Sequence, residues 1–170
     1  MDTIITILDQ HEMDSTANSN DRDSYRVRVA VRAVLTDDTN RVALMYASQR
    51  GYYKLPGGGV DDGEDLQTAL NRELMEEVGA TVAINDELGQ VIEWRDYKNF
   101  KQTSYAYTAT LVGDLVAPDL TESEIEEGFE VKWVSSLDEA INLVEAQSNS
   151  GEIGISFMCK RDAAILRSAQ

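Results

Sequence analysis

The fold is decided by one stretch of the chain, residues 58–80, which reads GGVDDGEDLQTALNRELMEEVGA. Asp65 is a good helix N-cap, because its carboxylate can accept hydrogen bonds from the free N–H groups of the first turn. Gly79 is the residue type that commonly ends a helix, because it adopts the left-handed conformation at no steric cost. The sequence therefore predicts a helix over residues 66–78.

Acidic residues occur on the apolar face of this predicted helix. At about 100° per residue, its apolar side chains form one arc that faces a core; they are Leu66, Ala69, Leu70, Leu74 and Val78. Glu73 and Glu77 fall inside that arc, and Glu76 falls at its edge. Buried, unpaired carboxylates are costly, and a cluster of hard oxygen ligands without histidine or cysteine suits Mg²⁺ or Mn²⁺. The alternative is an exposed acidic helix with a poorly defined apolar face.

A glycine-rich loop precedes the helix. It consists of Leu55 and Pro56 followed by three glycines, residues 57–59. Such glycines allow the backbone to approach a ligand closely. A strand, a glycine turn and a helix rich in carboxylates together indicate a metal–phosphate site. The loop is not a P-loop, because the Gly-Lys-Ser/Thr sequence is missing.

The spacing of these residues resembles the Nudix box, G-x5-E-x7-R-E-U-x-E-E-x-G-U, in which U is a bulky aliphatic residue. Gly58, Glu64 and the segment 72–79 match every specified position. Ala80 departs from the pattern, because it is small where a bulky residue is usual. The resemblance implies an α/β fold, the Nudix α/β/α sandwich with a mixed central sheet. It also implies a Mg²⁺-dependent hydrolase, with Mn²⁺ as a substitute ion.

The resemblance implies a role for each residue of the box. The expected metal ligands are Glu73, Glu76 and Glu77, together with the backbone carbonyl of Gly57. Glu73 and Glu76 are also expected to be catalytic with Arg72, which would orient the carboxylates through a charge-assisted pair. Glu64 would bind metal through water or brace the loop, while Gly58 and Gly79 are structural. The general base stays open: it comes from the box helix or from a later loop that contains Glu122, Glu124, Glu126 and Glu127.

Substrate contacts outside the box are suggested by a set of arginines. Arg26, Arg28 and Arg32 share one face of a predicted strand, where they could bind phosphates or pair with nearby acids. We name Arg26, Arg28 and Glu124 as candidate substrate-binding residues. Aromatic residues that could stack on a base follow later in the chain: Trp94, Tyr97, Phe100, Tyr105 and Tyr107. For the two tyrosines at 105 and 107, the sheet core is the alternative location.

Three functions are compatible with the sequence. The first is hydrolysis of a phosphoanhydride bond in a small nucleotide-type diphosphate, either a nucleoside diphosphate linked to another moiety or a nucleoside triphosphate. The substrate could be an oxidised triphosphate, ADP-ribose, a nucleotide sugar or a dinucleoside polyphosphate. The second is a catalytically inactive Nudix module that senses such a ligand. The third is an acidic interaction protein whose glutamates merely bind cations.

Composition sets the wider limits. At 170 residues the chain suits one domain, residues 1–170, whose first 24 residues include a polar segment that we expect to be partly mobile. The net charge of -16 argues against a nucleic-acid or anionic membrane partner. We expect a cytoplasmic protein without a signal peptide or membrane span. Cys159 is expected to be a buried apolar residue. Many Nudix proteins are homodimers, so the resemblance is compatible with a dimer.

The remaining elements follow from hydrophobic periodicity. Strands are predicted over residues 3–8, 25–35, 41–48, 52–55, 88–95, 105–112 and 129–133. Residues 113–128 are predicted to form a loop. Helices are predicted to begin after Ser136 and near Ile155.

Overall fold

The computed structural model describes residues 1–8, 22–148 and 151–170. Its seven strands form one mixed sheet, whose bounds are β1 Thr3–Leu8, β2 Arg26–Thr36, β3 Val42–Ala47, β4 Tyr52–Lys54, β5 Val82–Arg95, β6 Phe100–Leu111 and β7 Phe129–Val134. The strand order is β1-β5-β6-β2-β3-β4, and β7 pairs with β3. The pairs β1–β5 and β2–β6 are parallel, whereas β5–β6, β3–β4 and β3–β7 are antiparallel.

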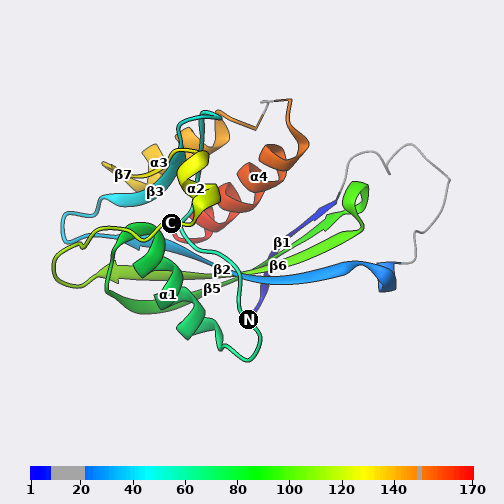
Figure 1. Ribbon diagram of the computed structural model, residues 1–170, viewed down its shortest axis with the longest axis horizontal. Coiled ribbons are helices and arrows are strands. Elements are labelled where there is room, and N and C mark those ends of the chain that lie inside the picture. The colour runs from blue at the N-terminus through cyan, green and yellow to red at the C-terminus, as the bar shows by residue number, and fades with distance from the viewer. Residues whose placement is uncertain (9–21, 149–150) are drawn as a thin grey trace.

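Helices cover both faces of this sheet (Figure 1). Helix α1, Leu66–Val78, packs on one face against odd-numbered residues of β2 such as Val31 and Ala33. Helices α3, Leu137–Glu145, and α4, Ile153–Ser168, pack on the opposite face against residues such as Val34 and Val91. The period-two alternation of β2 therefore supplies side chains to two separate cores. The expected α/β/α arrangement is confirmed.

Local signals set the ends of α1 as the sequence predicts. The Asp65 carboxylate accepts hydrogen bonds from the backbone N–H groups of Gln67 at 3.0 Å and Thr68 at 2.9 Å. Gly79 is left-handed, with φ of 72°, and a side chain there would clash with the carbonyl of Val116. The helix thus places its carboxylates in fixed positions relative to the glycine loop.

Two strands are longer than predicted, and one predicted loop contains a helix. β5 begins at Val82 and β6 at Phe100, because the two strands form one long antiparallel ladder. Helix α2, Glu122–Glu126, lies inside the predicted loop 113–128 and is capped by Thr121. The expectation of an unstructured loop there was wrong. Of the predicted N-terminal mobile segment, residues 9–21 lie outside the described part of the chain.

Among the helices that the structure describes, none combines the length and the apolar character needed to cross a membrane. Cys159 is 2% exposed, as predicted for a buried apolar residue. The aromatic residues predicted as a stacking surface divide between the faces of the sheet. Tyr105 and Tyr107 pack with the core under α1, so they follow the alternative that the sequence left open.

Candidate functional site

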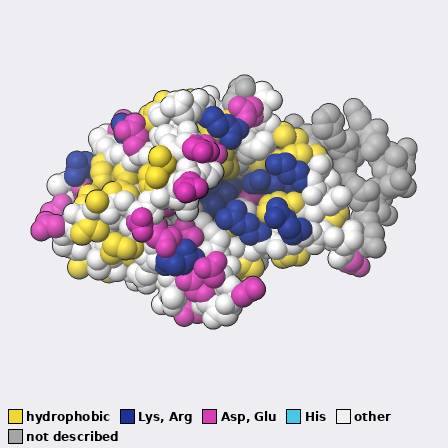
Figure 2. All heavy atoms as spheres, in the orientation of Figure 1, with side chains coloured by type: hydrophobic (Ala, Val, Ile, Leu, Met, Phe, Trp, Pro, Cys, Tyr) yellow, Lys and Arg dark blue, Asp and Glu magenta, His cyan; other side chains and the backbone are white. Residues whose placement is uncertain are grey.

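The glycine loop and α1 form one wall of a large cavity. The loop residues Gly57, Gly58 and Gly59 lie along β2, where the backbone N–H of Val31 donates to the carbonyl of Gly58 at 2.9 Å. The cavity, about 760 Å³, extends from this loop to β6, α2 and α4. In Figure 2 it is a hollow surrounded by Lys and Arg side chains, with Asp and Glu along one side.

Glu77 is the most buried carboxylate of α1, with 2% of its surface exposed. One of its oxygens, Oε2, accepts a hydrogen bond from the backbone N–H of Gly57 at 2.6 Å. The other, Oε1, accepts from the ammonium group of Lys54 at 2.8 Å. The predicted buried glutamate therefore exists, and both of its oxygens bind groups at the start of the glycine loop.

Arg72 joins the remaining acids of the box. Its Nε and Nη2 donate to the two oxygens of Glu64 at 3.0 and 2.9 Å. Its Nη1 donates to Glu73 at 2.9 Å and to Glu76 at 3.2 Å. A further bond of 2.9 Å from Nη2 reaches the carbonyl of Gly59. The pairing with Glu64 raises the pKa of Arg72, and the guanidinium group ties the helix to the loop.

Glu73 lies against the glycine loop. A Cβ atom added at Gly58 would clash with its carboxylate. Burial raises the pKa of Glu73, and the negative charge of Glu77 adds to that effect, although Arg72 opposes it. A cation bound beside Glu73 and Glu77 would lower the free-energy cost of burying their charges, because it would stabilise the charged carboxylates.

The oxygen donors at this wall of the cavity suit a divalent cation. Within the described residues, no three His, Cys, Asp or Glu side chains are grouped as a ready metal site. Glu73, Glu76, Glu77 and Gly57 nevertheless all line the cavity, and no hydrogen bond to the Gly57 carbonyl is found in this part of the chain. Carboxylate and carbonyl oxygens are the ligands that Mg²⁺ and Mn²⁺ prefer, so the donor chemistry fits such an ion.

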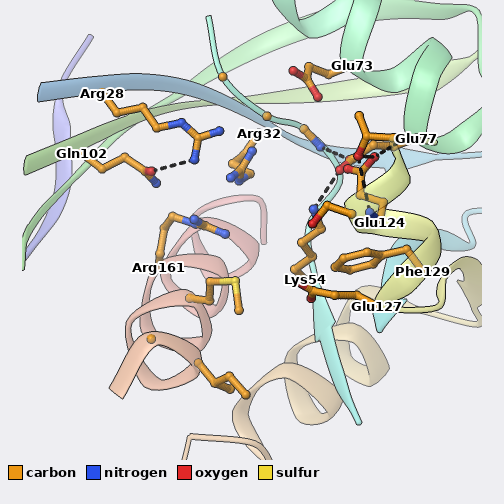
Figure 3. A pocket seen from close by; sticks show the side chains of 18 of the residues that line it. Arg28, Arg32, Lys54, Glu73, Glu77, Gln102, Glu124, Glu127, Phe129 and Arg161 are labelled. Atoms are coloured by element: carbon orange, nitrogen blue, oxygen red, sulfur yellow. Dashed lines mark hydrogen bonds and ion pairs between the residues drawn. The ribbon is translucent and has the colours of Figure 1, made fainter. Parts of the chain in front are cut away.

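Helix α2 brings a fourth carboxylate to the same wall. Glu124 accepts hydrogen bonds from the N–H and hydroxyl groups of Thr121 at 2.9 and 2.8 Å, which completes a capping box. Burial alone would raise the pKa of Glu124, but the bonds from Thr121 and the charge of Lys54 lower it. Its side chain also lies beside that of Glu77 (Figure 3). Of the four acids in residues 122–127, Glu124 and Glu127 line the cavity.

Positive side chains line the rest of the cavity. All 15 Lys and Arg residues of the chain lie within the described ranges, and nine of them line the cavity. They are Arg26, Arg28, Arg32, Arg50, Lys54, Arg72, Arg95, Lys98 and Arg161. A chain with a net charge of -16 thus gathers most of its cations at one place, where they can attract a phosphate-rich ligand.

Two of the three predicted substrate contacts are arginines of β2. Arg28 faces the cavity and donates to Gln102 at 3.4 Å. Arg26 lies at the outer end of the strand, where its guanidinium group stacks over the ring of Phe100 at 4.8 Å. The two important cavity residues that sequence reasoning missed are Lys54 and Arg161. Lys54 could have been found from its place just before the glycine loop, whereas nothing local marks Arg161 on α4.

Comparisons with known proteins agree with this architecture. A family model described as NUDIX domain matches residues 26–153. An RNA pyrophosphohydrolase from Dinoroseobacter shibae is 39% identical over 72 residues, which cover 41% of this chain and 45% of that protein. The chain therefore spans less than half the length of that curated relative.

Solved structures share the fold at lower identity. A MutT protein from Methanosarcina mazei is 21% identical with a TM-score of 0.58, over 86% of this chain and 98% of that one. A NUDIX hydrolase from Nitrosomonas europaea is 20% identical with a TM-score of 0.59, over 81% and 88% of the two chains. The mixed sheet between helices is thus a fold common to these proteins.

Proposed function

This chain belongs to the Nudix family, and we propose that it hydrolyses a phosphoanhydride bond in a nucleotide-type substrate with the help of Mg²⁺. One observation carries the proposal. A single cavity has four carboxylates on one wall, Glu73, Glu76, Glu77 and Glu124, and cations around the remainder. Phosphoryl transfer to water needs this combination of charge neutralisation and positioning.

The carboxylates of α1 are assigned to the metal. Glu73, Glu76 and Glu77 would hold Mg²⁺, or Mn²⁺ in its place, with the carbonyl of Gly57. When bound, the ion neutralises charge on the phosphate oxygens and lowers the pKa of a water molecule. Arg72 is a positioning residue, because its bonds to Glu73 and Glu76 fix both carboxylates beside the loop. Glu64 in turn fixes the guanidinium plane of Arg72 through two bonds.

Glu124 is assigned as the general base. It is the acid of α2 that lies beside Glu77, and the hydrogen bonds from Thr121 and the charge of Lys54 favour its ionised form. One oxygen stays bound to Thr121, which leaves the other available to take a proton from the attacking water. This assignment favours a base outside the box helix, one of the two sources that the sequence left open.

The cations are assigned to the substrate. Arg26 and Lys98 line the outer part of the cavity, where they can attract a phosphate chain. Phe100, which the sequence suggested as a stacking surface, is buried beneath the guanidinium group of Arg26 and holds it at the cavity through a cation–π contact of 4.8 Å. The relative from Dinoroseobacter shibae bears the name RNA pyrophosphohydrolase, so the 5′ end of a triphosphorylated RNA belongs among the substrates to be tested.

The test is phosphate release from a substrate panel with Mg²⁺ or Mn²⁺. The panel contains canonical and oxidised nucleoside triphosphates, ADP-ribose, nucleotide sugars, dinucleoside polyphosphates and a short 5′-triphosphorylated RNA. We expect metal-dependent turnover of one class, reduced at least about a hundredfold in Glu76→Gln. Glu87→Gln, which removes a charge from β5 outside the cavity, is the matched control and should keep full activity.

Two results would contradict the proposal. Turnover that is unchanged in Glu76→Gln would remove the box carboxylates from the mechanism. The proposed hydrolysis would also be contradicted if no member of the panel were turned over. If a nucleotide then still raised the melting temperature, the sensing function would replace catalysis, with the cavity acting as a binding site only.

A further inference from the structure

Three arginines converge on the cavity opposite its carboxylate wall. Figure 3 shows Arg28 and Arg32 from β2 and Arg161 from α4 pointing toward a common space, on the far side from Lys54 and Glu124. All three line the cavity. Like charges from two different elements repel one another, so their convergence requires compensation from neighbouring groups or from a ligand.

Arg32 is buried without adequate partners. Its surface is 5% exposed, and its Nη1 donates to the carbonyl of Val31 at 2.8 Å. Its Nε has no hydrogen-bond partner among the described residues. Burial lowers the pKa of Arg32 to about 10, and the charge of Arg161 contributes to the same shift. The folded chain therefore keeps a cation here at a cost to its own stability.

The nearby carboxylates are already committed to other guanidinium groups. Arg161 binds Asp162 through bonds of 2.6 and 3.0 Å and lies 3.8 Å from Glu93. Glu93 also accepts from Arg95 at 2.6 Å. The carboxylates of Asp162 and Glu93 are thus already paired with the guanidinium groups of Arg161 and Arg95. Neither is left to pair with Arg28 or Arg32.

Arg28 and Arg32 form the excess. The Gln102 amide oxygen, 3.4 Å from Arg28 Nη1, is a neutral and distant partner. Arg28 is more exposed than Arg32, and the partial burial of its guanidinium group and the charge of Arg161 lower its pKa. The charge of Glu73 acts favourably on Arg28, and the charges of Asp162 and Glu77 act favourably on Arg32. Asp162 is already paired with Arg161, however, and the two glutamates belong to the α1 wall. The four guanidinium groups of Arg28, Arg32, Arg95 and Arg161 thus exceed the two nearby carboxylates by two charges, which matches a dianionic phosphate group.

The glycine loop connects this arginine cluster to the carboxylates. Glu73 lies against Gly58, and a Cβ atom added at the next residue, Gly59, would be 3.2 Å from Nη2 of Arg28. The carboxylate wall and the arginine cluster therefore meet at the adjacent residues Gly58 and Gly59. A phosphate chain that lies along the loop can reach both.

We propose that Arg28, Arg32 and Arg161 form a subsite for a phosphate group of the substrate that is not part of the cleaved anhydride. The link to cleavage rests on the proposed function, whereas phosphate binding itself does not. The group belongs either to a chain of three or more phosphates or to a phosphate monoester elsewhere on the substrate. Both sources share the same dianionic chemistry.

The first experiment measures phosphate binding without metal. In EDTA, orthophosphate at ten times its dissociation constant should raise the melting temperature of the wild-type chain by about 4 °C. Arg28→Gln and Arg32→Met should each lose that rise. Without phosphate, Arg32→Met should melt no lower than wild type, because it removes a buried charge that lacks a partner.

Lys101→Gln is the matched control for this experiment. It removes one positive charge from β6, where the ammonium group stacks over Trp94 at 4.8 Å outside the cavity. It should keep the full phosphate-induced rise. The subsite is overturned if phosphate stabilises Arg28→Gln and Arg32→Met as much as wild type, or if it stabilises none of the four proteins.

The second experiment identifies the source of the phosphate. A chain of phosphates predicts that tripolyphosphate binds at least about tenfold more tightly than orthophosphate, whereas a monoester predicts similar affinities. In turnover, Arg28→Gln should raise KM about tenfold for substrates with a further phosphate and less than twofold for ADP-ribose. If KM rose equally for substrates with a further phosphate and for ADP-ribose, the assignment of the subsite to a phosphate outside the cleaved bond would be overturned. If phosphate binds as expected but no substrate is cleaved, only the proposed hydrolysis fails.

Discussion

The carboxylate of Glu73 occupies the space that a side chain on Gly58 would need. Gly58 does not have a positive φ, so alanine is compatible with its backbone. The added methyl group would instead push Glu73 away, which is easy because the clash involves the end of a flexible side chain. Glycine at this position is therefore required for the placement of Glu73 and not for the conformation of the loop.

We expect Gly58→Ala to lower kcat about a hundredfold, as a displacement of about 1 Å can do, with little change in melting temperature. Steady-state kinetics and thermal melting measure the two effects. Gly154→Ala is the control, because its new methyl group would come no closer than 4.0 Å to the Tyr97 hydroxyl. An unchanged kcat in Gly58→Ala would show that the position of Glu73 does not matter to the reaction.

Glu124→Gln tests the assignment of the general base. Glutamine can still accept the hydrogen bonds of a capping box, so α2 should remain folded. The variant cannot take a proton, and we expect kcat to fall at least about a hundredfold. Glu126→Gln on the same helix changes an exposed residue outside the cavity and should leave kcat unchanged. If the two variants had similar activities, the general base would have to be assigned to the box helix instead.

Local signals explain why α1 could be predicted to the residue. Its N-cap Asp65 and its C-terminal Gly79 act within one turn of the helix, so the sequence contains both ends. The same reasoning could have found α2, because Thr121 and Glu124 have capping-box spacing. Glu124 is thus a helix-capping residue as well as a candidate base.

Contacts between distant residues explain what the sequence could not predict. Asp162 on α4 accepts a hydrogen bond from the backbone N–H of Leu55 at 3.0 Å, across 107 positions of the chain. That bond holds α4 at the cavity and so presents Arg161 to it. No periodicity or cap encodes such a pairing, because it depends on how α4 packs on the sheet.

The pH dependence of stability should include a contribution from Asp37. Burial alone would raise its pKa, but donors from Arg41 and Thr39 outweigh burial and lower the pKa from 3.8 to about 2. Because the folded-state value is the lower one, the carboxylate stabilises the fold above about pH 4. This contribution is lost as the pH falls from about 4 to 2.

Asp37→Asn should therefore have a lower urea midpoint than wild type at pH 7 and pH 5. The difference should shrink between pH 4 and pH 3, where the wild-type carboxylate begins to lose its advantage. Asp38→Asn, at the exposed neighbouring position, should match wild type throughout. A difference between Asp37→Asn and wild type that does not change with pH would assign the effect to hydrogen bonding without charge.

In the absence of metal, the ammonium group of Lys54 supplies the positive charge that balances the carboxylate of Glu77. The two groups are 2.8 Å apart, and their side chains are 13% and 3% exposed. Lys54→Met leaves Glu77 as a buried charge without its cation, so we expect a loss of about 3 kcal/mol of unfolding free energy in EDTA. If Glu77 is a metal ligand, Mg²⁺ should stabilise this variant more than wild type, because the ion replaces the missing ammonium charge.

Urea unfolding with EDTA or Mg²⁺ measures both effects, and Lys132→Met is the matched control. Lys132 pairs with Glu130 at 2.9 Å, but their side chains are 43% and 50% exposed. Its loss should leave the free energy of unfolding close to that of wild type, with no difference between the two conditions. Should Mg²⁺ stabilise wild type and Lys54→Met equally, Glu77 would not bind the ion, and its bonds to Lys54 and Gly57 would serve only to hold the glycine loop on α1.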